Sequence, residues 1–244
     1  MNFFFKLNTG YLFISTAKKF YKIPLNFNAY RNLLIEKKKI TNVKKNKIFK
    51  NFLADESFFL IKKSNRYYNF DLKKNYFFLK EYENLFKLKA SSKKLKVTKT
   101  FFFKNIDLLL KYEPFIYKNI YKFASKIYIH KSSCHGDFYY KNILESGNKK
   151  ILIDWNNFQV DASYYYDFIN YIIFSKKNYF GNWYKSWSKN YEYLTNRYPK
   201  VYVETYVLWK ISTEMNSQKL DSRLKNKMIN ILKGYTNFIN RRNQ

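Results

Sequence analysis

The chain has 244 residues, enough to bury the core of one large domain or of two lobes. Lysine and arginine number 47 against 17 aspartate and glutamate residues, so the formal net charge is +30. A single cysteine excludes an internal disulfide, and the lack of an apolar run of roughly 18 residues predicts no membrane-spanning helix.

The positive charge has two interpretations. It is typical of nucleic-acid or anionic-membrane binding, and residues 37–47 form a basic run that would suit RNA binding. However, only six of the basic residues are arginines, whose forked side chains suit phosphate recognition better than lysine does. Abundant Phe, Tyr, Ile and Asn indicate an AT-rich coding bias instead. We therefore expect no nucleic-acid partner, and we read 37–47 as a solvated helix end and loop.

Residues 1–72 predict a small, β-rich N-lobe with five short strands and one helix. Gly10 suits a turn between the first two strands, and Pro24 ends the third. The helix covers residues 28–40, with Asn28 as its N-cap. The expected strands are 3–7, 11–16, 20–23, 57–61 and 67–70, with turns at 8–10 and 63–65.

From residue 73 the spacing of apolar residues predicts mostly helices, so residues 73–244 form a larger helical C-lobe. A hairpin interrupts them, with strands at 142–145 and 150–153 around a turn that contains Gly147. The expected helices are 75–88, 106–112, 116–127, 165–175, 183–193, 202–215 and 222–239.

The segment 133–155 is the part of the sequence that indicates chemistry. Asp137 is followed five positions later by Asn142, and the hairpin brings the chain back to Asp154, which ends an apolar strand beside Trp155. One carboxylate can accept the proton of an acceptor hydroxyl. An amide and a second carboxylate can hold Mg²⁺ on phosphate groups.

The pattern H-G-D-x4-N followed by I-D-W resembles the aminoglycoside phosphotransferase and choline kinase family, relatives of the protein kinases. The resemblance covers about residues 133–170, including Asp161 and Asp167. It implies a two-lobed, protein-kinase-like α+β fold. It also implies that Asp137 is catalytic, that Asn142 and Asp154 bind metal, and that the remaining motif residues, His135 and Asp167, support the loop. Asp161 is a candidate cap of the following helix.

The resemblance gives three further candidates in the N-lobe as cofactor-binding residues. Lys22 stands where the family has a strand lysine that grips the α- and β-phosphates, although Lys18 and Lys19 are rivals. Glu36, on the following helix, is the candidate to pair with that lysine. Gly10 stands in the turn that would cover the phosphates, where kinases have a glycine-rich loop.

We therefore expect an ATP- and Mg²⁺-dependent phosphotransferase that acts on a hydroxyl of a small molecule. The acceptor stays open among amino sugars, choline- or ethanolamine-like compounds and surface-polysaccharide sugars, as does the choice of ATP or GTP. The alternatives are a catalytically weak nucleotide-binding protein and a nucleic-acid-binding protein.

We expect a cytoplasmic protein without a signal peptide, for which peripheral membrane contact is open. Trp183, Trp187 and Trp209 would suit a sugar or quaternary-amine site, but buried packing is the better interpretation of each.

Overall fold

The computed structural model describes residues 4–8, 10–16, 18–54, 56–58, 62–65, 68–69, 75–89, 93–111, 113–146, 149–175, 178–217 and 221–242. The chain forms two compact units. The first comprises residues 1–89 and 137–158, and the second comprises residues 90–136 and 159–244. The sequence analysis expected one boundary at residue 72. That boundary would put residues 137–158 in the helical lobe, whereas in the structure they belong to the first unit.

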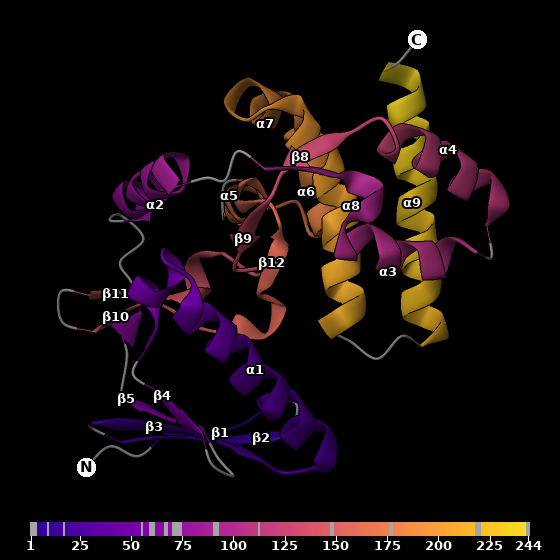
Figure 1. Cartoon of the computed structure of the whole chain (residues 1–244). Coiled ribbons are helices and arrows are strands. Elements are labelled where there is room, and N and C mark those ends of the chain that lie inside the picture. Colours follow the sequence, from indigo (N-terminus) through magenta and orange to yellow (C-terminus); the bar gives the residue numbers. More distant parts are fainter. Residues whose placement is uncertain are drawn as a thin grey trace. The chain divides into compact units, whose positions relative to one another are not determined.

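An antiparallel sheet of five strands, in the order β1-β2-β3-β5-β4, forms one part of the first unit (Figure 1). Phe13 on β2 pairs with Lys22 on β3, which in turn pairs with Lys62 on β5. The turn expected at 63–65 is wrong, because pairing with β3 holds all three residues in β5 despite their turn propensity, and residues 63 and 64 also pair with β4. The strands are β1 (Phe4–Asn8), β2 (Tyr11–Ser15), β3 (Lys19–Pro24), β4 (Glu56–Phe58) and β5 (Lys62–Asn65).

Helix α1 (Phe27–Lys45) follows β3 and packs on it. Asn26 is its N-cap, because the side chain accepts a hydrogen bond from the Ala29 backbone N–H at 2.9 Å. The expected cap at Asn28 is therefore wrong, since that residue already lies inside the first turn. The buried residues recur every three or four positions, so one face of the helix is buried; they are Ala29, Leu33, Glu36, Ile40 and Val43.

A second, three-stranded sheet completes the strands of the first unit, in the order β11-β10-β6. Strands β10 (Ile143–Ser146) and β11 (Lys149–Leu152) form the expected hairpin; its turn residues 147 and 148 lie outside the described residues. Strand β6 (Tyr68–Asn69) pairs with β10, so the strand expected at 67–70 belongs to this sheet and not to the N-terminal one.

An aromatic cluster fills the core beneath this second sheet. Phe49 of the short helix η1 (Phe49–Phe52) lies at its centre, with ring centroids of four neighbours 5.1–5.9 Å away. Helix α2 (Asn75–Lys89) contributes two of these rings. The aromatic cluster comprises Phe49, Tyr82, Phe86, Phe138, Trp155 and Phe158, each 2% exposed or less.

The second unit is mainly helical. Helix α3 packs across α8, which also contacts α5, α7 and α9 (Figure 1). Residues 202–213 of α8 are all buried or nearly so, which explains why the helix has no single apolar face. The helices are α3 (Phe101–Leu110), α4 (Pro114–Ala124), α5 (Tyr164–Ile173), α6 (Trp183–Lys189), α7 (Tyr191–Arg197), α8 (Lys200–Ser217) and α9 (Ser222–Arg242), and the short strands are β7 (Lys94–Lys96), β8 (Tyr128–His130), β9 (Ser132–Cys134) and β12 (Gln159–Ala162).

Two helices of the second unit differ from the expectation. Helix α3 begins at Phe101 rather than at residue 106, because the Thr100 hydroxyl caps it by accepting from the Phe103 N–H. The helix expected at 183–193 divides at Asn190, whose side-chain amide donates to the backbone carbonyls of Asn178 and Ser186. Residues with local hydrogen-bonding side chains thus set both boundaries.

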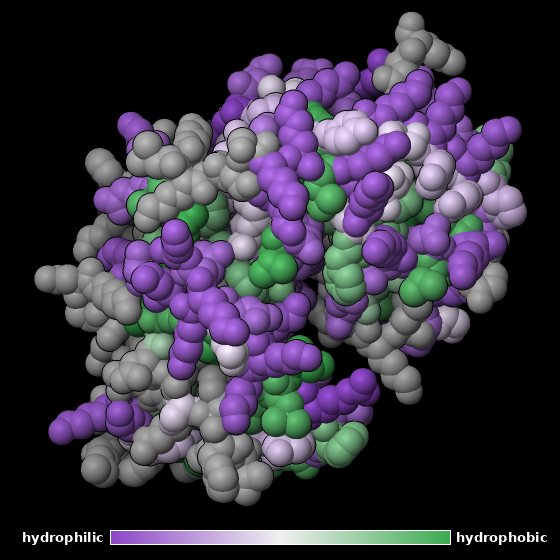
Figure 2. Space-filling view, viewed as in Figure 1, coloured by the Kyte–Doolittle hydropathy of each residue, from purple (hydrophilic) through white to green (hydrophobic). Residues whose placement is uncertain are grey.

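Hydrophilic side chains cover most of the coloured surface on the face shown in Figure 2, as the lysine content leads one to expect. Among the described residues, no helix combines the length and apolar character needed to cross a membrane. The three tryptophans considered for a ligand site, Trp183, Trp187 and Trp209, are 4%, 0% and 0% exposed, so their rings serve packing.

Candidate active site

The chain enters the candidate site through a buried loop. Asp167, in the first turn of α5, accepts backbone N–H bonds from His135 at 2.7 Å and from Gly136 at 3.0 Å. Asp167 and His135 are both fully buried, and these two bonds offset part of the cost of burying a carboxylate. Gly136 has φ +90°, a conformation that glycine adopts without strain. The direction of the chain ahead of Asp137 is thereby fixed. Asp161 does not cap α5; it forms an ion pair with Lys131, and Ser163 is the N-cap residue.

Asp137 and Asn142 are joined by hydrogen bonds across the short helix η3 (Tyr140–Asn142). The Asn142 amide nitrogen donates to the Asp137 carbonyl at 2.8 Å and to Asp137 Oδ2 at 3.1 Å. Because both bonds engage the nitrogen, the amide oxygen of Asn142 faces away from Asp137 and keeps its acceptor capacity. Asn142 is 6% exposed, so this orientation is held by its surroundings.

The hairpin brings Asp154 back toward Asn142. The Ile153 N–H donates to the Asn142 carbonyl at 3.0 Å, so these two residues face each other at the base of the hairpin, and Asp154 is the next residue. Asp154 has φ 62° and ψ 64°, and it is the single non-glycine residue with positive φ in the described part of the chain. Such a backbone costs on the order of 1–2 kcal/mol and concentrates at functional sites.

Asn156 is a site residue that the sequence analysis missed. It lies in the short helix η4 (Trp155–Asn157), and its amide nitrogen donates to Asp154 Oδ1 at 2.9 Å. This bond fixes the orientation of the carboxylate. An asparagine two positions after a strand-ending aspartate is a usable signal, because short polar side chains hydrogen-bond locally in turns.

The aromatic cluster anchors both carboxylate-bearing segments. Phe138, next to Asp137, stacks on Tyr82 with ring centroids 4.6 Å apart and an interplanar angle of 15°. Trp155, next to Asp154, meets Phe49 edge-on at 5.5 Å. Each carboxylate is therefore followed by a ring that is locked into one core, which restricts the movement of the two loops relative to each other.

The pKa values of two tyrosine hydroxyls are raised in part by the negative charge of these carboxylates. Burial raises the pKa of Tyr139 to about 12, and the negative charges of Asp137 and Asp154 add to the shift. Burial likewise raises the pKa of Tyr11 to about 12, with contributions from Glu36 and then Asp154. Asp154 thus acts on both hydroxyls, one beside Asp137 and one beside Glu36. The sequence analysis missed both tyrosines, since nothing distinguished them among 25.

Lys22 and Glu36 form an ion pair of the first unit. Lys22 Nζ lies 3.0 Å from Glu36 Oε2, and the two side chains are 15% and 1% exposed. The ammonium group also lies 4.6 Å from the ring centroid of Tyr11. Three residues further along α1, Lys39 Nζ donates to the Phe158 carbonyl at 2.8 Å. The helix that carries Glu36 is therefore tied to the segment that follows Asp154.

Gly10 has a structural reason to be glycine. Its φ is +82°, and an added Cβ would lie 2.5 Å from Asn26 Nδ2, the side chain that caps α1. Its carbonyl also accepts a hydrogen bond from the Leu25 N–H at 2.8 Å. These contacts explain the glycine through packing on the start of α1, and they bring no evidence about phosphate.

The described residues contain no group of three or more His, Cys, Asp or Glu side chains arranged to hold a metal ion. The site instead offers one carboxylate, on Asp154, and the amide oxygen of Asn142, whose nitrogen is engaged by Asp137. These are hard oxygen donors, the kind that Mg²⁺ takes when substrate phosphates complete its coordination. The donor set therefore fits a magnesium ion shared with a nucleotide.

Comparison with solved structures places the fold. Choline kinase LicA from Streptococcus pneumoniae superposes with a TM-score of 0.53 at 15% identity, covering 95% of this chain and 91% of that one. A thermostable mutant of aminoglycoside phosphotransferase APH(4)-Ia gives a TM-score of 0.53 at 10% identity, covering 97% of this chain and 92% of that one. The chain shares its fold with these kinases.

A choline/ethanolamine kinase family protein from Mesorhizobium loti matches at 12% identity over 96% of this chain and 88% of that one, with a TM-score of 0.50. LicA has also been solved in complex with AMP. No protein-family model and no curated protein matches the sequence. The resemblance indicated by the motif is thus confirmed at the level of the fold.

Proposed function

We propose that this protein is an ATP- and Mg²⁺-dependent phosphotransferase that moves the γ-phosphoryl group to a hydroxyl of a small molecule. The observation that supports this most directly is the hydrogen-bonded hairpin carrying Asp137, Asn142 and Asp154, in a chain with a kinase fold. Amino sugars, choline-like alcohols and surface-polysaccharide sugars are the acceptor classes of the proposal.

Asp137 is the proposed general base. It orients the acceptor hydroxyl and takes its proton as the new O–P bond forms and the bond between the β- and γ-phosphates breaks, releasing ADP. The amide of Asn142, 3.1 Å from Asp137 Oδ2, keeps this carboxylate from rotating. Positioning supplies most of the rate enhancement in this reaction class.

Asn142 Oδ1 and the Asp154 carboxylate are the proposed metal ligands. When bound, the Mg²⁺ ion offsets the negative charge of the phosphates. Asn156 donates a hydrogen bond to Asp154 Oδ1 at 2.9 Å, which fixes the orientation of the carboxylate that is proposed to hold the cation.

The remaining site residues are proposed to bind the phosphates or to support the loop that carries Asp137. Lys22 holds the α- and β-phosphates, and Glu36 positions its ammonium group through the 3.0 Å ion pair. Gly10 lies in the turn that is proposed to cover the phosphates. Asp167 supports the loop through the backbone of His135, which fixes where Asp137 begins.

The decisive experiment measures ADP release from ATP with a panel of hydroxyl acceptors and a metabolite extract. Asp137→Asn should lower turnover by roughly 10²- to 10⁴-fold, the range for losing a general base. Asp161→Asn is the matched control, because this aspartate is 42% exposed and forms an ion pair with Lys131 on the surface. Equal turnover in the parent and in Asp137→Asn would refute the proposed role.

A catalytically weak nucleotide-binding protein is the second candidate, and the glycine content favours it. Gly10 is the only glycine before Gly136, so the chain lacks a glycine-rich loop to bring backbone N–H groups to the phosphates. Thermal shifts with ATP, measured with and without Mg²⁺, separate the two. Metal-independent binding without turnover would support this second candidate.

A further inference from the structure

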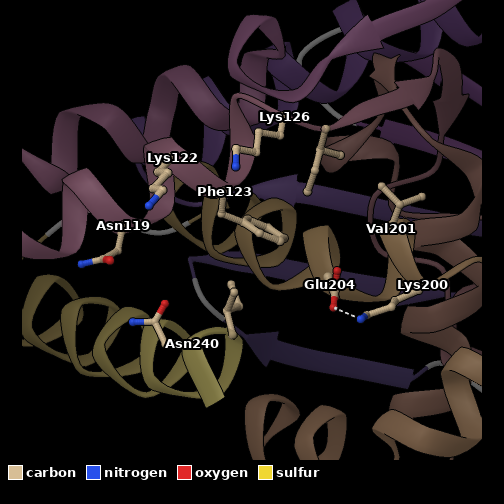
Figure 3. Close-up of a pocket in the computed structure, with 10 residues that line it drawn as sticks. Asn119, Lys122, Phe123, Lys126, Lys200, Val201, Glu204 and Asn240 are labelled. Carbon is tan, nitrogen blue, oxygen red and sulfur yellow. Dashed lines mark ion pairs between the residues drawn. The ribbon is translucent and has the colours of Figure 1, made fainter. Parts of the chain in front are cut away.

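A cavity lies in the second unit, among residues that the proposed phosphotransfer site does not use. It has a volume of about 630 Å³ and opens between α4, α8 and α9 (Figure 3). This volume is within the range of small-molecule sites, which runs from about 300 to 1,000 Å³. Phe123 from α4, Val201 from α8 and Ile239 from α9 give it an apolar lining.

The walls of this cavity are fixed by direct contacts between the helices. Phe123 of α4 meets Tyr235 of α9 edge-on, with ring centroids 6.2 Å apart. The Tyr235 hydroxyl donates to the Glu204 backbone carbonyl of α8 at 2.8 Å. Tyr235 is fully buried, so it ties the three helices together behind the cavity. A cavity with such walls is preorganised, which lowers the entropic cost of filling it.

The polar side chains around the cavity carry an excess of positive charge. Lys122, Lys126 and Lys200 line it together with one carboxylate, Glu204. Glu204 is engaged by Lys200, whose Nζ lies 3.6 Å away, and by the Tyr191 hydroxyl, which donates to it at 2.9 Å. Across the described part of the chain, Lys122 and Lys126 form no ion pair.

Lys122 lies in the last turn of α4, and Lys126 follows two residues after the helix ends at Ala124. Both lysines line the cavity, so they add positive charge to its lining. An anion bound against them would offset this charge. The apolar side chains of Phe123 and Ile127 line the same cavity, so they favour an anion that carries an apolar part.

We propose that this cavity binds a small amphipathic anion, a carboxylate carried on an aliphatic chain. The carboxylate lies against Lys122 and Lys126, while the chain covers Phe123, Val201 and Ile239. Charge complementarity selects the head group and the apolar lining selects the chain. The proposal is independent of the phosphotransfer site, with which the cavity shares no residue.

Octanoate is the test probe, titrated into the whole protein by calorimetry at low salt. It should bind saturably, while acetate, which has no chain, and octanol, which has no charge, should bind at least tenfold more weakly. Lys122→Gln and Lys126→Gln should each weaken octanoate about two- to fivefold, the range for exposed ion pairs. Raising the salt concentration should weaken it further.

Lys118→Gln is the matched control, because Lys118 is an exposed α4 residue that does not line the cavity. Val201→Phe tests the chain site, since it fills the apolar part and leaves the lysines in place; circular dichroism verifies that the variants fold. The proposal is overturned if octanoate does not saturate, if octanol binds as tightly, or if Lys118→Gln has the same effect as Lys122→Gln.

Discussion

The hairpin segment of the first unit and the core around α8 in the second unit are both built on buried aromatic rings, and both contain buried polar atoms without a hydrogen-bond partner. They differ in that the first carries a carboxylate, that of Asp154, on a backbone with positive φ. In the first, the aromatic cluster supports side chains whose polar atoms are directed by hydrogen bonds, as Asn142 is toward Asp137. In the second, Trp209 stacks on Tyr166 at 5.2 Å. Its indole N–H, like that of Trp183, is buried without a hydrogen-bond partner.

The proposed function accounts for this difference, because it places the reacting groups in the hairpin segment and none in the α8 core. An unsatisfied buried donor costs roughly 1–3 kcal/mol, and the α8 core carries two in exchange for close packing of large rings. The hairpin segment instead accepts a strained backbone at Asp154, which directs a carboxylate and stabilises nothing by itself. Mutations in the α8 core should therefore change stability alone, whereas mutations near the hairpin should change activity as well.

The largest expected effect comes from removing one ring beneath each region. Phe49→Ala and Phe102→Ala both delete a side chain that is fully buried, and each should lower the free energy of unfolding by about 3–5 kcal/mol. Phe49 contacts Trp155 beside Asp154, so its loss should also lower ATP turnover at temperatures where the variant is folded. Phe102 contacts Tyr166 in the second unit, so Phe102→Ala should keep its turnover.

Chemical denaturation and single-temperature kinetics of both variants provide the measurement. Equal turnover losses in Phe49→Ala and Phe102→Ala would remove the distinction between the two regions.

The next largest effect on stability is expected from breaking the ion pair between Lys22 and Glu36. Lys22→Met leaves the Glu36 carboxylate 1% exposed and without its lysine, so the free energy of unfolding should fall by roughly 2–3 kcal/mol. This is somewhat less than for a fully buried pair, because Lys22 is 15% exposed. The KM for ATP should rise too, since the proposal has Lys22 binding phosphate.

The double variant Lys22→Met/Glu36→Gln separates these two effects. Removing both charges should recover much of the stability while ATP affinity stays low. If the double variant regains the parent KM, Lys22 does not bind phosphate.

Two glycines with positive φ make a matched pair for a smaller effect. An alanine at Gly181, φ +87°, meets nothing within 4 Å, so Gly181→Ala should cost only the backbone strain of about 1–2 kcal/mol. Gly10→Ala adds a Cβ that would lie 2.5 Å from Asn26 Nδ2, and it should cost roughly 1 kcal/mol more through the displaced N-cap. Thermal denaturation compares the two, and equal losses would show that the Asn26 contact contributes nothing.

The secondary-structure elements that the sequence predicted correctly are those that nearby residues determine. The hairpin at 142–153 was predicted correctly because Gly147 stands between two apolar runs of the sequence, and α2 and α9 because their apolar spacing is regular. The prediction of a turn at 63–65 was wrong because long-range pairing decides this segment. Ser64 and Asn65 favour turns, but both pair with β3, and Ser64 also pairs with β4.

The same distinction between local and long-range causes holds for the candidate site. The residue types and spacing of Asp137, Asn142 and Asp154 identified the segment, because the chemistry requires those side chains. Tyr11 and Asn156 were not predictable, since their positions depend on which groups the fold brings near Glu36 and Asp154. The positive φ of Asp154 was not predictable either, because aspartate adopts this conformation more often than most residues but still only in a minority of cases.

The smallest expected effect tests the electrostatic difference between the two regions directly. Burial and the charges of Asp137 and Asp154 raise the pKa of Tyr139 to about 12, whereas burial alone raises the pKa of Tyr184 in the second unit to about 12. Asp154→Asn removes one negative charge, and asparagine tolerates the positive φ at this position. The pKa of Tyr139 should therefore fall toward the usual value near 10, while that of Tyr184 stays unchanged.

Carbon NMR of ring-labelled tyrosine between pH 9 and 12.5 follows both groups, with Tyr139→Phe and Tyr184→Phe giving the assignments. The same shift has a consequence for stability. A tyrosine whose pKa is raised on folding stabilises the fold below pH 10 and loses that contribution as the pH rises toward 12. Asp154→Asn should make the contribution of Tyr139 smaller, so the variant should lose less stability over this pH interval than the parent does. An unchanged Tyr139 pKa in Asp154→Asn would mean that the two groups do not share one field, and the proposed arrangement of Asp137 and Asp154 around a common nucleotide would lose its electrostatic support.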